Sequence, residues 1–254
     1  RALKDKAANV LVAAGGVFVI VAVTLIFFYL LYEVVPLFKS ASVEPVASYS
    51  VPLAPADTNT HLTVSNSQSD NSRTVYLAME EQAEIGLRID HLANATFFYL
   101  ADGRVHSQIP LPVPTGTIVT SVGEGGAGTQ IIALGLSNGA AMVVKHEYKI
   151  TYPNDIRLIT PRIEFPFGQE PVVIDELRNP IDNIVVRDTE DSLILIGAAA
   201  GRQLKSSYFT KEEDFLSGEI TLEKATLTMP VGTGEIFSLQ LSPDTRWLYV
   251  ASKQ

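Results

Sequence analysis

Four histidines are the first residues to weigh for chemistry, because an imidazole can ligate a metal or carry a proton near neutral pH. They are His61, His91, His106 and His146. No two of them lie within a few residues of each other, whereas histidines that ligate a metal usually include a short local pair. We therefore expect each to be a surface residue or a hydrogen-bonded strand residue, and we predict no metal site.

Three acidic clusters could supply oxygen ligands to a divalent cation. They are Glu80–Glu81, Glu190–Asp191 and Glu212–Glu213–Asp214. None has the alternating oxygen spacing of a calcium loop. A solvated surface is therefore the favoured interpretation for all three.

A glycine-rich segment, GEGGAG at residues 123–128, has the composition of a phosphate-binding loop. Such loops precede a helix whose amino end helps to hold the anion, and they continue into Lys-Ser or Lys-Thr. Here the next stretch, 130–136, reads as a strand, no Lys-Ser or Lys-Thr follows, and Glu124 adds a negative charge. The segment predicts a plain loop between two strands, and the sequence implies no cofactor.

The groupings that nucleophilic catalysis needs are also missing from the sequence. There is no G-x-S-x-G turn, and no set of serine, histidine and aspartate that the sequence alone brings together. The chain has no cysteine, which excludes disulfide bonds and thiolate metal ligands. We predict that the chain is not an enzyme.

The charge balance restricts the partners. From Ser40 onward the chain has 15 Lys and Arg against 26 Asp and Glu, a net charge of −11. Nucleic-acid binding depends on positive charge that neutralises phosphates. We expect no nucleic-acid partner, and the same acidity disfavours long-range attraction to anionic lipid heads.

An apolar run at residues 10–32 precedes all of these groups. Its 23 residues carry no charge, and a helix of that length, rising about 1.5 Å per residue, spans the roughly 30 Å hydrocarbon core of a bilayer. Arg1, Lys4 and Lys6 precede the run, so segment 1–9 should stay in the cytoplasm. A cleaved signal peptide is the alternative, but its apolar core has only about 7 to 15 residues. We predict a transmembrane helix in contact with membrane lipid.

The remainder reads as a linker with a first strand at 33–60 and an all-β domain at 61–254. Short stretches rich in β-branched and aromatic residues alternate with Gly, Asn, Asp and Pro, a pattern typical of strands joined by turns. The predicted strands are 74–79, 96–100, 117–122, 130–136, 140–146, 183–188 and 192–199. Only segment 211–216 suggests a helix.

These strands follow a loose repeat of two strands joined by a polar turn. Successive units begin at Leu62, Ile118, Asn183 and Ile236, which are 56, 65 and 53 residues apart. Periods of this size are typical of β-propeller blades. We predict a WD40-like β-propeller whose ring is incomplete and continues past Gln254. A β-sandwich is the structural alternative.

Two turns are the candidate partner contacts. Ser137, Asn138 and Gly139 join one predicted hairpin, and Asp102 and Gly103 join another. Asn-Gly and Asp-Gly pairs supply the positive φ angles that tight hairpin turns need. Because propellers usually bind partners through loops at one end of the ring, we expect partner contacts at these five residues.

Three features of residues 1–38 carry a family likeness. They are Lys-Asp-Lys ahead of the span, the Gly15–Gly16 pair, and the exit Glu-Val-Val-Pro-Leu-Phe at 33–38. In these features the segment resembles the first membrane helix of the large phosphate-type, PstC-like ABC transporter permeases of proteobacteria. In that family a propeller-like periplasmic insert follows the first helix. The resemblance implies an inner-membrane protein whose β domain lies in the periplasm.

The resemblance also implies a function. We expect the chain to be the N-terminal anchor and periplasmic domain of an ABC permease for phosphate uptake, with the domain as a docking or regulatory platform. The implied partners are the second permease subunit, the ATPase and the solute-binding protein. The alternative is a membrane-tethered β-propeller scaffold in envelope assembly or signalling, because one span and a repeat domain fit it equally well.

Overall fold

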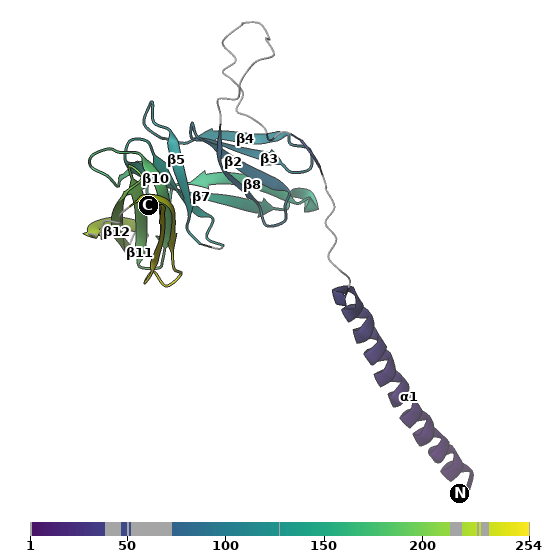
Figure 1. Ribbon diagram of the computed structural model, residues 1–254. Coiled ribbons are helices and arrows are strands. Elements are labelled where there is room, and N and C mark those ends of the chain that lie inside the picture. Colours follow the sequence, from purple (N-terminus) through teal and green to yellow (C-terminus); the bar gives the residue numbers. More distant parts are fainter. Residues whose placement is uncertain are drawn as a thin grey trace. The chain divides into compact units, whose positions relative to one another are not determined.

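The structure, a computed structural model, describes residues 2–38, 47–49, 51, 73–126, 128–213, 220–227, 229 and 234–253. The chain divides into two compact units, Arg1–Val46 and Ala47–Gln254. The first contains a helix, and the second contains the β-strands (Figure 1).

The first unit contains one long apolar helix. α1 (Ala2–Val34) has 33 residues and continues into a short 3-10 helix, η1 (Val35–Phe38). Within the described residues, Leu11–Phe38 is the one helical segment long and apolar enough to cross a membrane, with a mean hydropathy of 2.8. Membrane anchors and signal sequences share this property. The predicted span 10–32 falls inside α1, and residues 33–38, which we assigned to the linker, are still helical.

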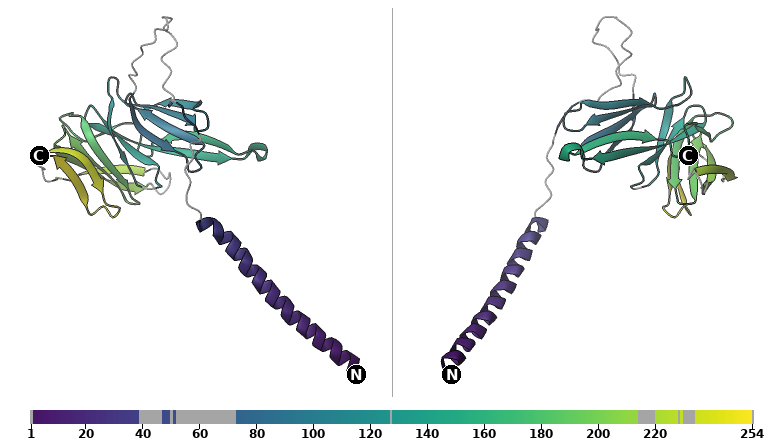
Figure 2. Two further views of the ribbon diagram at one scale, coloured as in Figure 1. Left: turned by 45° about the vertical axis from the view of Figure 1, so that its right-hand side comes forward. Right: turned by 180° about the vertical axis from the view of Figure 1, so that it is seen from behind.

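The second unit consists of antiparallel sheets whose strands pair in chain order (Figure 2). The first sheet contains β1 (Thr74–Met79), β2 (Ile85–Asp90), β3 (Asn94–Tyr99) and β4 (Val105–Pro110). The second contains β5 (Val119–Glu124), β6 (Ile131–Leu136), β7 (Ala140–Thr151) and β8 (Leu158–Glu164), with η2 (Pro153–Asp155) before β8 and the short β9 (Val172–Val173) beside β7. The third contains β10 (Ile181–Asp188), β11 (Ser192–Ala199), β12 (Gln203–Glu213) and β13 (Ile220–Leu227), and the fourth contains β14 (Glu235–Leu241) and β15 (Leu248–Lys253).

The predicted strands can be compared with these sheets directly. Each of the seven stretches coincides with or overlaps a strand, so a mostly β unit behind an apolar helix is confirmed. The strand at 74–79, predicted as the second of its unit, is the first of its sheet. Leu62, the predicted start of that unit, lies outside the described residues.

The helical interpretation of 211–216 is wrong at the residues that can be compared. Lys211, Glu212 and Glu213 belong to β12, which is paired on both sides, with β11 and β13. At these three residues the register pairs β12 with β13 alone, and the amide of Lys211 donates to the carbonyl of Asp191 at 2.9 Å. The backbone polar groups find partners in this way, so the polar composition of the segment does not prevent a strand. The rest of the segment lies outside the described residues.

Consecutive sheets share three apolar cores. The first core lies between the first and second sheets, the next between the second and third, and the last between the third and fourth. β6 contributes to two of them: Ile132 and Leu134 face the first core, while Ile131 and Ala133 face the second. Because both faces of β6 are buried, its sequence is a continuous apolar run instead of an alternating one.

The first strands of the sheets lie against one another. β5 contacts β1 and β10, and β10 also contacts β14. Hydroxyl groups of Thr120 and Ser121 on β5 both donate to the carbonyl of Ile181 on β10, at 2.7 and 2.6 Å. A Cβ on Gly123 would lie 2.4 Å from the carbonyl oxygen of Ile184, so the close approach of β5 and β10 requires glycine there.

Candidate functional site

The Asp102–Gly103 turn joins β3 to β4. Gly103 has a positive φ of 73°, as the turn chemistry predicts, and a Cβ there would lie 2.6 Å from the ring of Tyr49. Asp102 is exposed, and its carboxylate accepts hydrogen bonds from the backbone and side chain of Arg104, at 3.0 and 2.6 Å. These bonds lower the pKa of Asp102. The aspartate is therefore a surface charge already paired with its neighbour.

The Ser137–Asn138–Gly139 turn joins β6 to β7. The side-chain oxygen of Ser137 accepts the amide of Ile118 at 3.1 Å, and that of Asn138 accepts the amide two positions later at 3.2 Å. Gly139 has a φ of 79° and is buried. Its carbonyl accepts the amides of residues 174 and 175, at 3.0 and 2.9 Å. This turn is covered by the 174–179 segment at its glycine and leaves Ser137 and Asn138 only partly exposed.

The structure places these two turns at opposite ends of the strands. Gly139 precedes β7, whereas Arg157 follows it and forms an ion pair with Glu84. The amide of Leu100, two positions before Asp102, donates to the carbonyl of Glu84 at 2.9 Å. The 12 residues of β7, at about 3.3 Å per residue, therefore separate the two turns. A partner at one end of the strands can contact one turn and not the other.

An arginine holds the hairpin of β7 and β8 against the first sheet. Arg157 pairs with Glu84 and, at 3.4 Å, with Glu80. Glu80 is buried and also accepts the amide of Glu84 at 3.3 Å. The solvated interpretation of the Glu80–Glu81 cluster is therefore wrong for Glu80, because a buried carboxylate needs partners of this kind. Its arginine lies 77 positions away in the chain.

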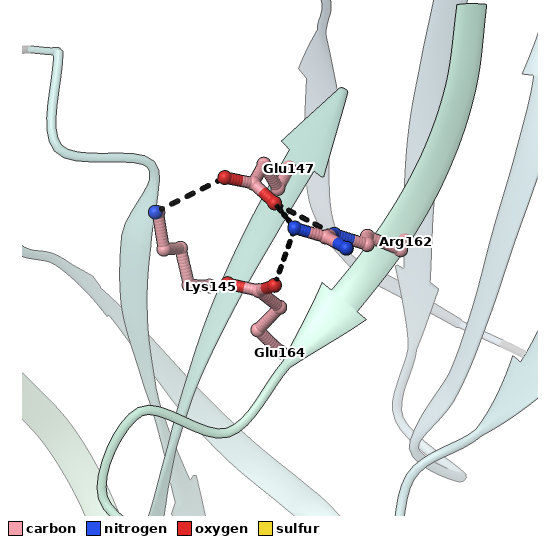
Figure 3. Close-up of polar contacts among 4 residues, drawn as sticks. All are labelled: Lys145, Glu147, Arg162 and Glu164. Atoms are coloured by element: carbon pink, nitrogen blue, oxygen red, sulfur yellow. Dashed lines mark hydrogen bonds and ion pairs between the residues drawn. The ribbon is translucent and has the colours of Figure 1, made fainter. Parts of the chain in front are cut away.

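A group of four charged side chains covers one face of the β7–β8 ladder (Figure 3). Arg162 pairs with Glu147 and, at 2.8 Å, with Glu164, and Lys145 pairs with Glu147 at 3.5 Å. Hydrogen bonding to Arg162 lowers the pKa of Glu147. Lys145 lies opposite Glu164 and Glu147 opposite Arg162 in the register. Two cations neutralise two anions, so the group is a solvated ladder face with no net charge.

The opposite face of the same strand carries a buried aromatic group. The Nε2 atom of His146 lies 3.5 Å from the hydroxyl of Tyr76 on β1, and its ring packs edge-on against Tyr148, which packs edge-on against Phe97 on β3. Burial lowers the pKa of His146 to about 4. Burial and the charge of Glu124 raise the pKa of Tyr76 to about 12. All of these side chains are therefore neutral at pH 7, which suits packing between two sheets rather than proton transfer.

The remaining sequence candidates stay apart. His91 and His106 are half-buried in different segments, and His61 lies outside the described residues. Within the described part of the chain, no group of three or more His, Asp or Glu side chains could hold a metal ion. The predicted loop 123–128 begins later than expected, because Gly123 and Glu124 still belong to β5; Gly125, Gly126 and Gly128 lie between β5 and β6. Arg187 donates to the carbonyl of Gly125 at 3.0 Å.

Comparison with known proteins adds no family. No protein-family model matches the chain, and no curated protein matches it.

Proposed function

We propose that this chain is the N-terminal membrane anchor and periplasmic β domain of an inner-membrane ABC permease for phosphate uptake. The β domain would be a docking or regulatory platform for the solute-binding protein and other transporter subunits. The observation that carries the proposal is the apolar segment Leu11–Phe38, which is followed in the chain by a separate unit of β-sheets. The likeness of residues 1–38 to the first helix of such permeases gives the proposal its substrate class.

We also propose that the sheets are successive blades of a WD40-like propeller. Three properties support this: strands pair in chain order, each sheet packs on the next through its own core, and the first strands contact one another in series. Propeller blades share these properties. A β-sandwich has two facing sheets, which fits a series of sheets less well.

The anchor is tested by the intact mass of the protein purified from membranes. An uncleaved anchor keeps residues 1–38, and the protein stays in the membrane pellet after washing at high pH. A mass that lacks these residues would show that the helix is a signal sequence. Alkaline phosphatase fused after Gln254 should be active, because the domain is predicted to lie outside the cytoplasm.

The transporter hypothesis is tested by measuring the uptake of labelled phosphate in cells that lack the gene. We expect phosphate uptake to fall while uptake of labelled sulfate, the control, is unchanged. Unchanged phosphate uptake, with the domain still tethered to the membrane, would favour the alternative of a tethered scaffold in envelope assembly or signalling.

A further inference from the structure

The tip of the β7–β8 hairpin carries an exposed apolar cluster. Only the first part of β7 pairs with β6, up to Lys145, while the remainder continues beside β8 alone. The exposed fractions at the tip are 64% for Tyr152, 68% for Ile156 and 47% for Leu158. The ion pairs of Arg157 hold this tip against the first sheet. The hairpin therefore presents apolar side chains to solvent from a fixed base.

A continuous series of contacts connects this tip to Tyr49. The hydroxyl of Tyr49 donates to the carbonyl of Leu100 at 2.9 Å, and the amide of Leu100 donates to the carbonyl of Glu84 at 2.9 Å. The carboxylate of Glu84 pairs with Arg157, the residue after Ile156. We call this end of the second unit, defined by these five residues, the Tyr49 end. The apolar tip belongs to it.

The chain itself limits how far the Tyr49 end can lie from the end of the apolar helix. Tyr49 comes 11 positions after Phe38, the last residue of the apolar segment. A chain extends by at most about 3.6 Å per residue, so this connection spans no more than about 40 Å. If Leu11–Phe38 crosses a bilayer, Tyr49 is therefore tethered within that distance of the residue at which the apolar segment ends, and the Tyr49 end is the part of the second unit in direct contact with this tyrosine.

From these observations we propose that the β7–β8 tip inserts Tyr152 and Ile156 into the interface of the same bilayer that holds α1, an inference that rests on the proposed anchor. A tyrosine beside aliphatic side chains suits the interfacial region, where an aromatic ring with a polar end is favoured. Lys149 and Asp155 flank the tip with opposite charges, so attraction to anionic lipid is not required. The short connection keeps the tip at high effective concentration near the lipid.

The absence of cysteine allows a site-specific test. Single variants Ile156→Cys, Leu177→Cys and Leu25→Cys of the full chain are labelled with an environment-sensitive fluorophore and reconstituted into phosphatidylcholine vesicles. Leu177 is the matched control, because it is an exposed aliphatic residue, 73% exposed, in the 174–179 segment at the opposite end of β7. Leu25 reports on α1. Lipids with a nitroxide near the headgroup or deep in the acyl chain are then added to quench the labels.

We expect shallow quenching and a blue shift at position 156, none at 177, and deep quenching at 25. In a second measurement, the label is placed at position 81 by the substitution Glu81→Cys, in the turn between β1 and β2 that also contains Glu84. We expect shallow quenching of this label in the otherwise unchanged chain and its loss when Y152S/I156S is added. Circular dichroism of each variant verifies that the sheets have formed.

The other outcomes contradict the proposal in distinguishable ways. Quenching at 25 with none at 156 would leave the anchor standing and overturn the membrane contact of the tip. If the label at 156 is shielded from a water-soluble quencher only in native membranes and not in pure lipid, the tip binds a protein. Quenching at 177 instead of 156 would place the opposite end against the bilayer. Absence of quenching at 25 would overturn the anchor itself.

Discussion

At the scale of single residues, the burial of His146 makes stability depend on pH. The folded pKa is about 4 against an ordinary value of 6.5, so the unfolded chain binds the proton more readily between these values. Stability from this residue is fully present above pH 6.5 and is lost as the pH falls toward 4. At about 1.4 kcal/mol per pH unit, the loss is at most about 3.5 kcal/mol.

The prediction is tested with His146→Phe, which keeps an aromatic ring and cannot titrate. We expect the free energy of unfolding in urea to fall less between pH 7 and pH 4.5 in the variant than in the parent, whatever its value at pH 7. Equal pH dependence in the two proteins would show that His146 is not held neutral by the fold.

Two aspartates offer a matched comparison of buried and exposed carboxylates. Asp90 is fully buried, and one of its oxygens accepts the amides of Leu92 and Asn94, at 3.0 and 2.9 Å. Asp90→Ala leaves these donors without a partner, and we expect a loss of about 2 to 4 kcal/mol in urea unfolding. Asp102→Ala, the control, removes a surface pair and should change stability little. Similar losses at both positions would contradict the hydrogen-bonding role of Asp90.

At the scale of secondary-structure elements, sequence periodicity predicted the apolar helix, the apolar strands and the two glycine turns. It missed β2, where Arg88 and Asp90 interrupt the apolar pattern of IGLRID, although both are buried in the structure. Neither the burial of Glu80 nor that of His146 could be predicted, because their neighbours come from another sheet. Local pattern predicts the strands whose apolar residues it can detect, and contacts between distant segments decide which polar groups are buried.

The charged face of β7 and β8 makes a prediction about association. β8 is the outer strand of its sheet, and charged side chains on such a strand discourage pairing with another chain. The double variant R162V/E164V removes one cation and one anion, so net charge is unchanged. We expect increased light scattering at high protein concentration with little loss of stability.

The control for this pair is R104V/D102V, which removes one opposite-charge pair at a turn. It lies at a turn and not along the unpaired edge of an outer strand, so its light scattering should equal that of the parent. If both variants associate equally, the effect is general surface hydrophobicity and not the edge of β8.

At the scale of the whole β unit, each sheet packs on its neighbours, but the last sheet shows an uncovered aromatic surface. Leu248 of β15 packs on the third core, while Tyr249 and Phe237 are 61% and 62% exposed. Trp247, the only tryptophan of the chain, directly precedes β15 and is 66% exposed. In β11, by contrast, the adjacent residues Leu195 and Ile196 point to opposite faces of the sheet, and both are buried, each in a different core.

Trp247 therefore reports on this surface without any labelling. We expect its fluorescence to have the long-wavelength emission of a solvated indole and to be quenched efficiently by acrylamide. Free N-acetyltryptophanamide provides the reference for full access. Emission at short wavelength with weak quenching would show that the surface is covered in solution.

The pairing of strands in chain order has a consequence for how the β unit can fold during its synthesis. Among the described strands, every ladder apart from the short β9 contact joins strands that are neighbours in the sequence, so each closes a short loop at small entropic cost. The first sheet ends at Pro110, before β5 begins at Val119. A chain that emerges progressively from its amino end can therefore complete one sheet before the next is synthesised, and each finished sheet supplies the apolar surface on which the following one condenses.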